Sequence, residues 1–382
     1  MLIATLPDAV RSVVEAVLDG QRITKDEALL LSYEADLHTL MRLAHAVRMT
    51  KAAQRGEVEN GTARVTYVVD RNINYSNICS CGCKFCAFFA APDDARGYVL
   101  SLEELERKVE ETVALGGSQI LMQGGHHPDL PFSFYEEMLG HIRSRFPSIH
   151  IHAFSPPEIV YFSELYGMKV SDVVRRLREA GLASIPGGGA EILVDRVRRI
   201  VAPNKCSAGA WLGVMREAHR QGLKTTATMM FGHVETRAER IEHMIAVREL
   251  QDETGGFTAF IPWGFQPRNT VLAKDETGAV RRSPTSCSYM RVLALSRIVL
   301  DNVPNIQASW VTMGPQIAQL ALLGGANDFG STMIEENVVA ATGVSFKLPE
   351  DDIRRLIREA GFIPRRRRMD YSLRDDDAGD ER

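Results

Sequence analysis

Four cysteines within eight positions are the residues of this sequence best suited to chemistry. Cys79, Cys81, Cys83 and Cys86 lie in the segment NICSCGCKFCAF. Three of them follow the pattern Cys79-x3-Cys83-x2-Cys86, which lets three thiolates on a tight loop reach three irons of a cubane iron–sulfur cluster. The fourth iron would have no protein ligand, and such an open iron can chelate the amino and carboxylate groups of S-adenosylmethionine and reduce its sulfonium.

Two other readings of the cysteines stay open. A structural zinc site needs four ligands, and the sequence has no second Cys or His pair at a matching spacing. An electron-carrier cluster would take Cys81, or the isolated Cys206 or Cys287, as its fourth ligand, although lone cysteines in helical segments are usually small buried hydrophobes. Cys81 is ambiguous because it forms a Cys-x-Cys pair on either side. We favour the x3, x2 set, since Phe85 before its last cysteine can cover the adenine and shield the cluster.

The overall composition narrows the class of protein. The chain has 382 residues and 45% hydrophobic content, enough for one large core, and its formal net charge of -4 does not suggest nucleic acid or an anionic membrane as partner. Acidic residues interrupt the apolar N-terminus, which therefore does not read as a signal peptide, and no apolar run is long enough to span a membrane. We expect a cytoplasmic protein that acts on a small molecule.

Short apolar or β-branched runs alternate with longer amphipathic segments, a pattern typical of repeated βα units. Eight strands are expected at 65–70, 118–123, 149–154, 182–186, 224–231, 257–263, 305–310 and, weakly, 326–328. Distinctive residues follow nearly every strand, and no Gly-x-Gly-x-x-Gly follows the first, so an α/β fold of the (β/α)8 TIM-barrel type is favoured over an open doubly wound sheet. The cysteine loop would then open onto the catalytic face of the barrel.

Extensions are expected at both ends of the barrel. We predict an N-terminal helical extension over 1–62, the barrel over 63–345, a C-terminal helical extension over 346–368 and a disordered acidic tail over 369–382. The four arginines 365–368 could mark an anionic partner, but a short charge run near a terminus is more often a solvated segment, and we favour that interpretation.

The stretch from Asn72 to Phe89 resembles the cluster loop of the radical S-adenosylmethionine superfamily, whose motif is Cys-x3-Cys-x-aromatic-Cys. From about Leu30 to Gly361 the chain is similar to the dehypoxanthine futalosine cyclases of menaquinone biosynthesis. The segments that carry this wider resemblance are His152–Glu158 (HAFSPPE), Ser184–Glu191 (SIPGGGAE), Phe260–Pro267 (FIPWGFQP) and Asn327–Asn337 (NDFGSTMIEEN).

The resemblance implies which residues bind cofactors. It assigns ligation of one 4Fe-4S cluster to Cys79, Cys83 and Cys86. It assigns contacts with S-adenosylmethionine to a set of residues around that loop, namely Phe85, Gln123, Gly124, Gly125, Ser155, Glu191 and Glu235. The Gln-Gly-Gly turn would hold the methionine amino group through backbone carbonyls, and the Gly-x-x-Glu element that ends at Glu235 would shape the adenine side. His126 stands where the superfamily often has an acid, and Cys81 and Ala90 also depart from its usual loop.

The resemblance also implies a reaction. A 5′-deoxyadenosyl radical would take hydrogen from ribose C4′ of dehypoxanthine futalosine, and the carbon radical would attack the benzoate ring, which then loses a proton and an electron. The candidate bases for that proton are His152, Glu158 and His233. Arg268 or Arg291 is the candidate partner of the benzoate carboxylate, and Glu335 a further substrate contact. Electrons would come from a donor such as flavodoxin or ferredoxin.

Related activities remain alternatives at this point. Aminofutalosine synthase and the deazaflavin-cofactor (FO) synthase subunit share the cysteine motif, and a non-catalytic iron–sulfur electron carrier would be a different class altogether. We favour the cyclase because we expect other residues in the HAFSPPE and IPGGGAE segments of the two sibling enzymes.

Overall fold

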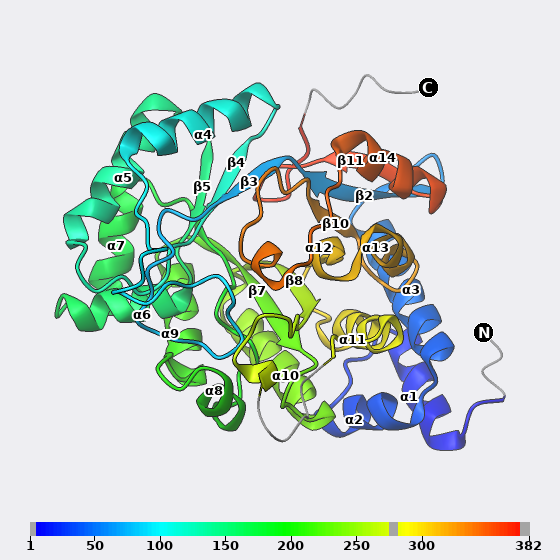
Figure 1. Ribbon diagram of the computed structural model, residues 1–382. Helices are drawn as coiled ribbons and strands as arrows, with labels where there is room; N and C mark the ends of the chain where they lie inside the picture. Colours follow the sequence, from blue (N-terminus) through cyan, green and yellow to red (C-terminus); the bar gives the residue numbers. More distant parts are fainter. Residues whose placement is uncertain (1–4, 275–281, 375–382) are drawn as a thin grey trace.

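The computed structural model describes residues 5–274 and 282–374, and a ring of strands surrounded by helices lies at its centre (Figure 1). The strands of the ring are β2 Thr62–Val68, β3 Asp70–Ile73, β4 Gln119–Met122, β5 His150–Ala153, β6 Ser184–Ile185, β7 Lys224–Phe231, β8 Phe257–Gly264, β9 Asn305–Ile306 and β10 Asp328–Ser331. β3 to β9 form one parallel sheet in chain order, β2 runs on into β3, and β10 pairs in parallel with β2. A single bridge between Gln307 and Asp328 joins the two sheets, so the expected barrel architecture is confirmed.

Helices cover the outside of the ring, as βα units require. Their bounds are α4 Leu102–Ala114, α5 Phe132–Arg145, α6 Pro156–Leu165, α7 Val170–Ala180, α8 Asp195–Val201, α9 Ala208–Arg220, α10 Arg237–Thr254, α11 Ser286–Val299, α12 Trp310–Met313 and α13 Pro315–Leu322, with 3₁₀ turns at Leu272–Lys274 and Ala340–Thr342. Capping boxes at Ser101 and Thr236 start α4 and α10. Each box satisfies backbone N–H groups that a helix start leaves unpaired.

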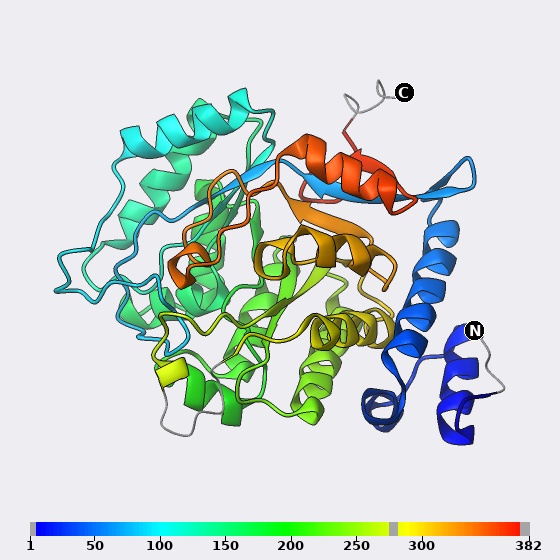
Figure 2. The same ribbon diagram turned by 45° about the vertical axis from the view of Figure 1, so that its right-hand side comes forward.

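The terminal segments pack on one side of the barrel. Helices α2 Lys25–Glu34 and α3 Leu37–Gln54 lie against α10 and α11, and α1 Asp8–Leu18 packs on α2 and α3. The short strand β1 Val58–Glu59 forms a hairpin with β2. At the other end of the chain, α14 Glu350–Glu359 leads into β11 Ile363–Arg366, which pairs in parallel with β2. Figure 2 shows α14 and β11, in red, running beside β2. Within the described ranges, no helix is both long and apolar enough to cross a lipid bilayer.

Several of the expected strands differ in extent from the observed ones. The strand expected at 65–70 is two strands, β2 and β3, and the one expected at 182–186 is reduced to Ser184–Ile185. The strand expected at 305–310 ends at Ile306, because Trp310 begins the short helix α12 and its indole donates to the Ser331 carbonyl at 2.8 Å. The weak last strand lies at Asp328–Ser331, a little beyond its expected position. The last strand was weak in the sequence because three of its four residues, Asp328, Gly330 and Ser331, are small or polar, although all four are buried.

The interpretation of the arginine run as a solvated segment is wrong. Arg365 and Arg366 belong to β11, and Arg367 is buried with 3% of its side chain exposed. Arg367 donates from Nε to Oδ2 of Asp328 at 2.6 Å and from Nη2 to Oδ1 at 3.1 Å. Met369, expected in the disordered tail, is buried as well, whereas residues 375–382 of that tail lie outside the described residues. The run ties the C-terminal segment to the barrel strands.

Replacing Asp328 by Asn should strongly destabilise the protein, because Arg367 would remain as a buried charge without its counter-charge. We expect the free energy of unfolding to fall by about 3–5 kcal/mol, measured by urea denaturation of the apoprotein. The matched control is Glu253→Gln, which breaks a bidentate pair with Arg216 whose side chains are both 49% exposed. Exposed pairs contribute little, so a loss in D328N no larger than in E253Q would contradict the argument.

Candidate active site

The cysteine loop lines a cavity of about 250 Å³ at the carboxyl ends of the first strands, which we call the cysteine chamber. Its walls include all four loop cysteines, Phe85, the 123–125 turn, Ser155, Glu158 and Glu191. The expected Cys79, Cys83 and Cys86 therefore face one space, and Cys81 is there too, with its sulfur 3.4 Å from that of Cys83. Soft thiolates on one wall are a donor set that fits an iron–sulfur cluster.

A buried lysine supports thiolate character in this chamber. Lys205 lies 4.9 Å from the centre of the Phe85 ring and donates to Oε1 of Glu191 at 2.9 Å. Burial opposes its charge, but Cys83 and Glu191 raise the pKa of Lys205 above its usual range. The hydrogen bond with Cys81, helped by Lys205 and opposed by burial, lowers the pKa of Cys83 to about 7. Burial raises the pKa of Cys86.

Glu158 holds the glycine turn after β4. Its Oε1 accepts from the Tyr75 hydroxyl at 2.8 Å and from the N–H groups of Gly124 at 3.1 Å and Gly125 at 3.3 Å. Its Oε2 accepts from the backbone N–H and the hydroxyl of Ser155, both at 2.7 Å. With both oxygens occupied in this way, Glu158 acts as an organiser of the turn, and the structure does not favour it as a base.

The glycines of that turn are required by the contacts around them. A Cβ on Gly124 would lie 2.2 Å from the Tyr75 ring, and Gly125 has φ +80° with the Cys79 sulfur 3.0 Å from its Cβ position. Because their N–H groups face Glu158, what the turn can offer to a ligand is its carbonyl groups. That is the arrangement expected for holding an ammonium group.

A second cavity, of about 290 Å³, lies inside the ring of strands, and we call it the barrel chamber. It shares six lining residues with the cysteine chamber, which are Gln123, Gly188, Gly189, Glu191, Trp263 and Val338. Glu191 stands at this boundary with φ +41°, a strained conformation for a residue with a side chain, held by its bond to Lys205. A group bound in one chamber would thus be adjacent to a group bound in the other.

Of the three candidate bases, only His152 lines the barrel chamber. His152 lines this chamber, and its Nδ1 bonds the Ser184 hydroxyl at 2.6 Å. The His233 ring is fully buried elsewhere: Nε2 bonds the Met230 carbonyl at 2.9 Å, and Nδ1 accepts the Val234 N–H at 2.8 Å. Burial lowers the pKa of His152 well below its usual value, so the ring is neutral and can accept a proton.

The structure does not bring four other expected residues to either chamber. Glu235 accepts from the N–H groups of Gly232 and His233 and pairs with Arg240, so it fixes a turn. Arg291 donates to the Ser32 and Ala35 carbonyls on the outside of the barrel.

The other two lie nearer the rim. Glu335 is held by Lys108 at 2.7 Å, and Arg268 is exposed beside Gly343. These residues were predicted from their positions in loops that follow strands. In the structure, their side chains point to neighbouring helices and loops.

The barrel chamber also contains polar residues to which sequence reasoning assigned no role. Asp70 and Asn72 alternate along β3 and both face it, and Glu336 does so after β10. Burial raises the pKa of Asp70 and of Glu336. The Oδ1 of Asn72 and the Oε1 of Gln119 are buried and have no hydrogen-bond partner in the described part of the chain. The sequence signal that could have revealed Asp70 and Asn72 is their spacing: polar residues at every second position of a buried strand lie on the same face of the sheet.

Comparisons with known proteins agree with this arrangement. Residues 73–246 match the model of the Radical SAM superfamily, and residues 254–379 match the CofH/MqnC C-terminal region. The chain is 43% identical to "Cyclic dehypoxanthine futalosine synthase" of Halalkalibacterium halodurans, over 96% of this chain and 95% of that one. It is 43% identical to the protein of the same name from Streptomyces coelicolor, over 96% and 90%.

A second group of relatives has a different name. The chain is 40% identical to "5-amino-6-(D-ribitylamino)uracil--L-tyrosine 4-hydroxyphenyl transferase 1" of Methanosarcina barkeri, over 94% of this chain and 92% of that one. Among solved structures, methylornithine synthase superposes with a TM-score of 0.67 at 19% identity, over 92% and 97% of the chains. The hydrogenase maturase HydG of Carboxydothermus hydrogenoformans gives 0.70 at 18%, over 95% and 80%. At such low sequence identities, the similarity to these structures supports the fold alone.

The cysteine loop at the mouth of a strand ring, the glycine turn beside it and the similarity along nearly the whole chain lead to one assignment. This chain belongs to the radical SAM superfamily, in the family that carries the CofH/MqnC C-terminal region, and is an S-adenosylmethionine-dependent enzyme.

Proposed function

We propose that this enzyme cyclises dehypoxanthine futalosine to cyclic dehypoxanthine futalosine, a step of menaquinone biosynthesis. The observation that carries the proposal is the 43% identity, over 96% of the chain, to two bacterial relatives with that name. The two adjoining chambers support it, because the reaction needs a site for radical generation next to a site for a polar substrate. Holding the two reactants in contact is the main contribution that such an enzyme makes.

The cysteine chamber is the proposed cofactor site. Cys79, Cys83 and Cys86 would hold a 4Fe-4S cluster, and the carbonyls of the Gly124–Gly125 turn would bind the methionine ammonium. When bound, the reduced cluster and S-adenosylmethionine supply a 5′-deoxyadenosyl radical. Phe85 would cover the adenine, and Lys205 would offset the negative charge of the thiolates. A one-electron donor such as flavodoxin or ferredoxin completes the proposal.

The barrel chamber is the proposed substrate site. Hydrogen is taken from ribose C4′ at the boundary near Glu191, and the carbon radical then attacks the benzoate ring deeper in the chamber. Asn72 and Gln119 offer buried acceptor oxygens to the ribose hydroxyls, since an unsatisfied buried oxygen is costly until a ligand donates to it. His152 is the proposed base for the ring proton.

A second candidate is the transfer of a 4-hydroxyphenyl group from tyrosine to 5-amino-6-(D-ribitylamino)uracil. The 40% identity to the Methanosarcina barkeri protein of that name favours it. Both reactions use a polyhydroxylated substrate beside a radical source, so the chambers alone do not decide between them.

The first prediction of this proposal concerns the products. Anaerobically reconstituted and reduced enzyme should convert dehypoxanthine futalosine to its cyclic product with one 5′-deoxyadenosine per turnover, followed by mass spectrometry. Parallel reactions should contain tyrosine with 5-amino-6-(D-ribitylamino)uracil in place of dehypoxanthine futalosine. Product only in those parallel reactions would replace the cyclase by the transferase.

The second prediction separates the cluster ligands from Cys81. Cys79→Ser should lose the cluster, whereas Cys81→Ser should retain it, because the x3, x2 set leaves Cys81 as a hydrogen-bond partner of Cys83. Iron and sulfide per chain give the measurement, and Cys287→Ser, at an exposed cysteine on α11, is the control. Cluster loss in C81S with retention in C79S would refute the assigned ligand set.

The third prediction concerns the unsatisfied amide of Asn72. Asn72→Leu should raise KM for the substrate by about tenfold or more, the value of one to two hydrogen bonds, while the melting temperature stays unchanged or rises. The matched control is Thr332→Val, which removes another buried and unsatisfied oxygen at a residue that does not line the barrel chamber. Thr332→Val should leave KM unchanged, and an equal rise of KM in both variants would remove Asn72 from substrate binding.

A further inference from the structure

Three residues of the barrel interior form a continuous hydrogen-bonded chain. Nδ1 of His152 lies 2.6 Å from the Ser184 hydroxyl, and the same hydroxyl lies 2.6 Å from Nε2 of His150. A hydroxyl can donate to one ring while it accepts from the other, so this chain can carry a proton in either direction. Of its three members, only His152 lines the barrel chamber.

Strand geometry explains why these side chains meet. His150 and His152 are two positions apart on β5, so both point to the same face of the sheet. Ser184 opens β6 and stands opposite His152 in the parallel register, which puts its hydroxyl between the two rings. His150 lies at the amino end of β5, and His152 lies nearer its carboxyl end. The hydrogen-bonded chain therefore runs along the barrel away from the cysteine chamber, which lies at the carboxyl ends of the strands.

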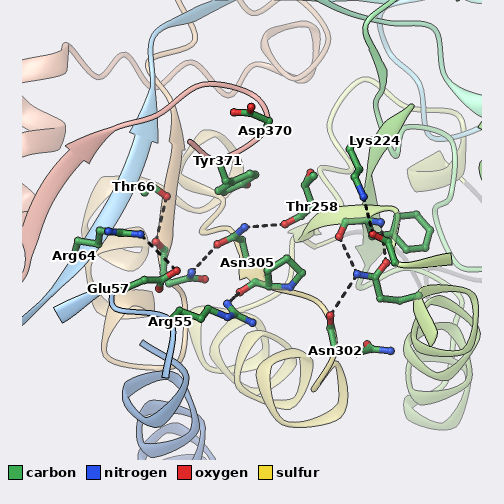
Figure 3. Close-up of a pocket in the computed structure, with 15 residues that line it drawn as sticks. Arg55, Glu57, Arg64, Thr66, Lys224, Thr258, Asn302, Asn305, Asp370 and Tyr371 are labelled. Carbon is green, nitrogen blue, oxygen red and sulfur yellow. Dashed lines mark hydrogen bonds and ion pairs between the residues drawn. The ribbon is translucent and has the colours of Figure 1, made fainter. Parts of the chain in front are cut away.

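The lower end of the chain approaches the outer surface at the amino ends of the strands. His150 is partly exposed, and the charge of Asp370 acts on it. Figure 3 shows Asp370 and Tyr371 on the C-terminal segment, beside Thr258 and Asn305, where they line a separate pocket of about 370 Å³. Tyr371 also lines the barrel chamber, so this segment separates the chamber from the lower pocket.

We propose that His152, Ser184 and His150 form a proton relay that carries the proton lost by the substrate ring from the barrel chamber to the side of Asp370. The inference rests on the proposed cyclisation and deepens it. His152 would touch the substrate as the base, whereas Ser184 and His150 act through it as positioning and relay residues.

The substrate ring must lose one proton and one electron to become aromatic again. After the bond between ribose C4′ and the ring has formed, the ring is a cyclohexadienyl radical whose new sp³ carbon still carries hydrogen. That C–H bond breaks: its proton goes to Nε2 of His152, its electron pair stays in the ring, and the unpaired electron passes to a one-electron acceptor of the iron–sulfur class. His152 then releases its Nδ1 proton to Ser184, whose hydroxyl proton moves to His150 and on towards Asp370.

The charges around the chain agree with transport in that direction. Burial, together with the charge of Arg367 and of His150 when it is protonated, lowers the pKa of His152, so a proton is not retained there. Burial lowers the pKa of His150 to about 4, and Asp370 acts in the opposite sense. The carboxylate of Asp370, which favours a charged His150, thus stands at the end of the hydrogen-bonded chain towards which the proton moves.

The test measures how 5′-deoxyadenosine and cyclised product partition in the reconstituted holoenzyme with dehypoxanthine futalosine. Ser184→Ala and His150→Gln each interrupt the chain after hydrogen has been taken from C4′. We expect both to keep forming 5′-deoxyadenosine, which reports that the variants are folded and loaded. Cyclised product per 5′-deoxyadenosine should fall by about tenfold or more, within the range for lost proton transfer. Ser184→Thr, which keeps the hydroxyl, should restore the ratio.

A matched control exists on the outside of the barrel. Nδ1 of His219 bonds the Thr254 hydroxyl at 2.6 Å, a histidine–hydroxyl pair of the same length that lines neither chamber. Thr254→Val should leave the ratio unchanged. A wild-type ratio in S184A and H150Q would overturn the relay while the cyclase stands. Absence of cyclised product from the wild-type enzyme would overturn the proposed function and the relay with it.

Discussion

The arrangement of the active site depends on one buried carboxylate. Glu158 starts α6, yet its five hydrogen bonds reach Tyr75 after β3, the glycine turn after β4 and its own N-cap Ser155 after β5. Three strand ends are thereby fixed relative to each other. The cysteine loop is fixed relative to these strand ends as well, because the His126 N–H at the end of the turn donates to the Cys79 sulfur at 3.3 Å.

The C-terminal segment closes the opposite end of the barrel, at the amino ends of the strands. A ring of short strands leaves an opening at its amino ends, and here the segment from Arg367 to Tyr371 crosses it, held by the buried pair of Arg367 with Asp328. The Arg367 guanidinium also lies 4.0 Å from the centre of the Tyr371 ring. The C-terminal segment is therefore part of the wall of the barrel chamber. A radical reaction requires such a wall, since water and small reductants would otherwise reach the intermediate.

Local signals in the sequence predicted the elements well and side-chain directions poorly. Capping boxes and the strand–helix alternation located the barrel, and the cysteine spacing located the chamber, because each depends on neighbours in sequence. The roles of His233, Glu235 and Arg291 were not predictable in this way. Their partners are set by tertiary packing, as when Arg291 on α11 reaches carbonyls near α2. The arginine run was misread for the same reason, since Asp328 is 39 residues away from Arg367.

The separation of the two chambers suggests where related enzymes diverge. The cysteine loop, the glycine turn and Glu158 all lie in the first three βα units. The barrel chamber draws its walls from most strands of the ring and from the C-terminal segment, and apart from the six residues that it shares with the cysteine chamber its polar lining can change without altering that chamber. Asp70, Asn72, His152 and Glu336 are therefore the residues at which a cyclase and a transferase of this family should differ. Because the chain His152–Ser184–His150 begins among them, the route by which the proton leaves is part of that same difference.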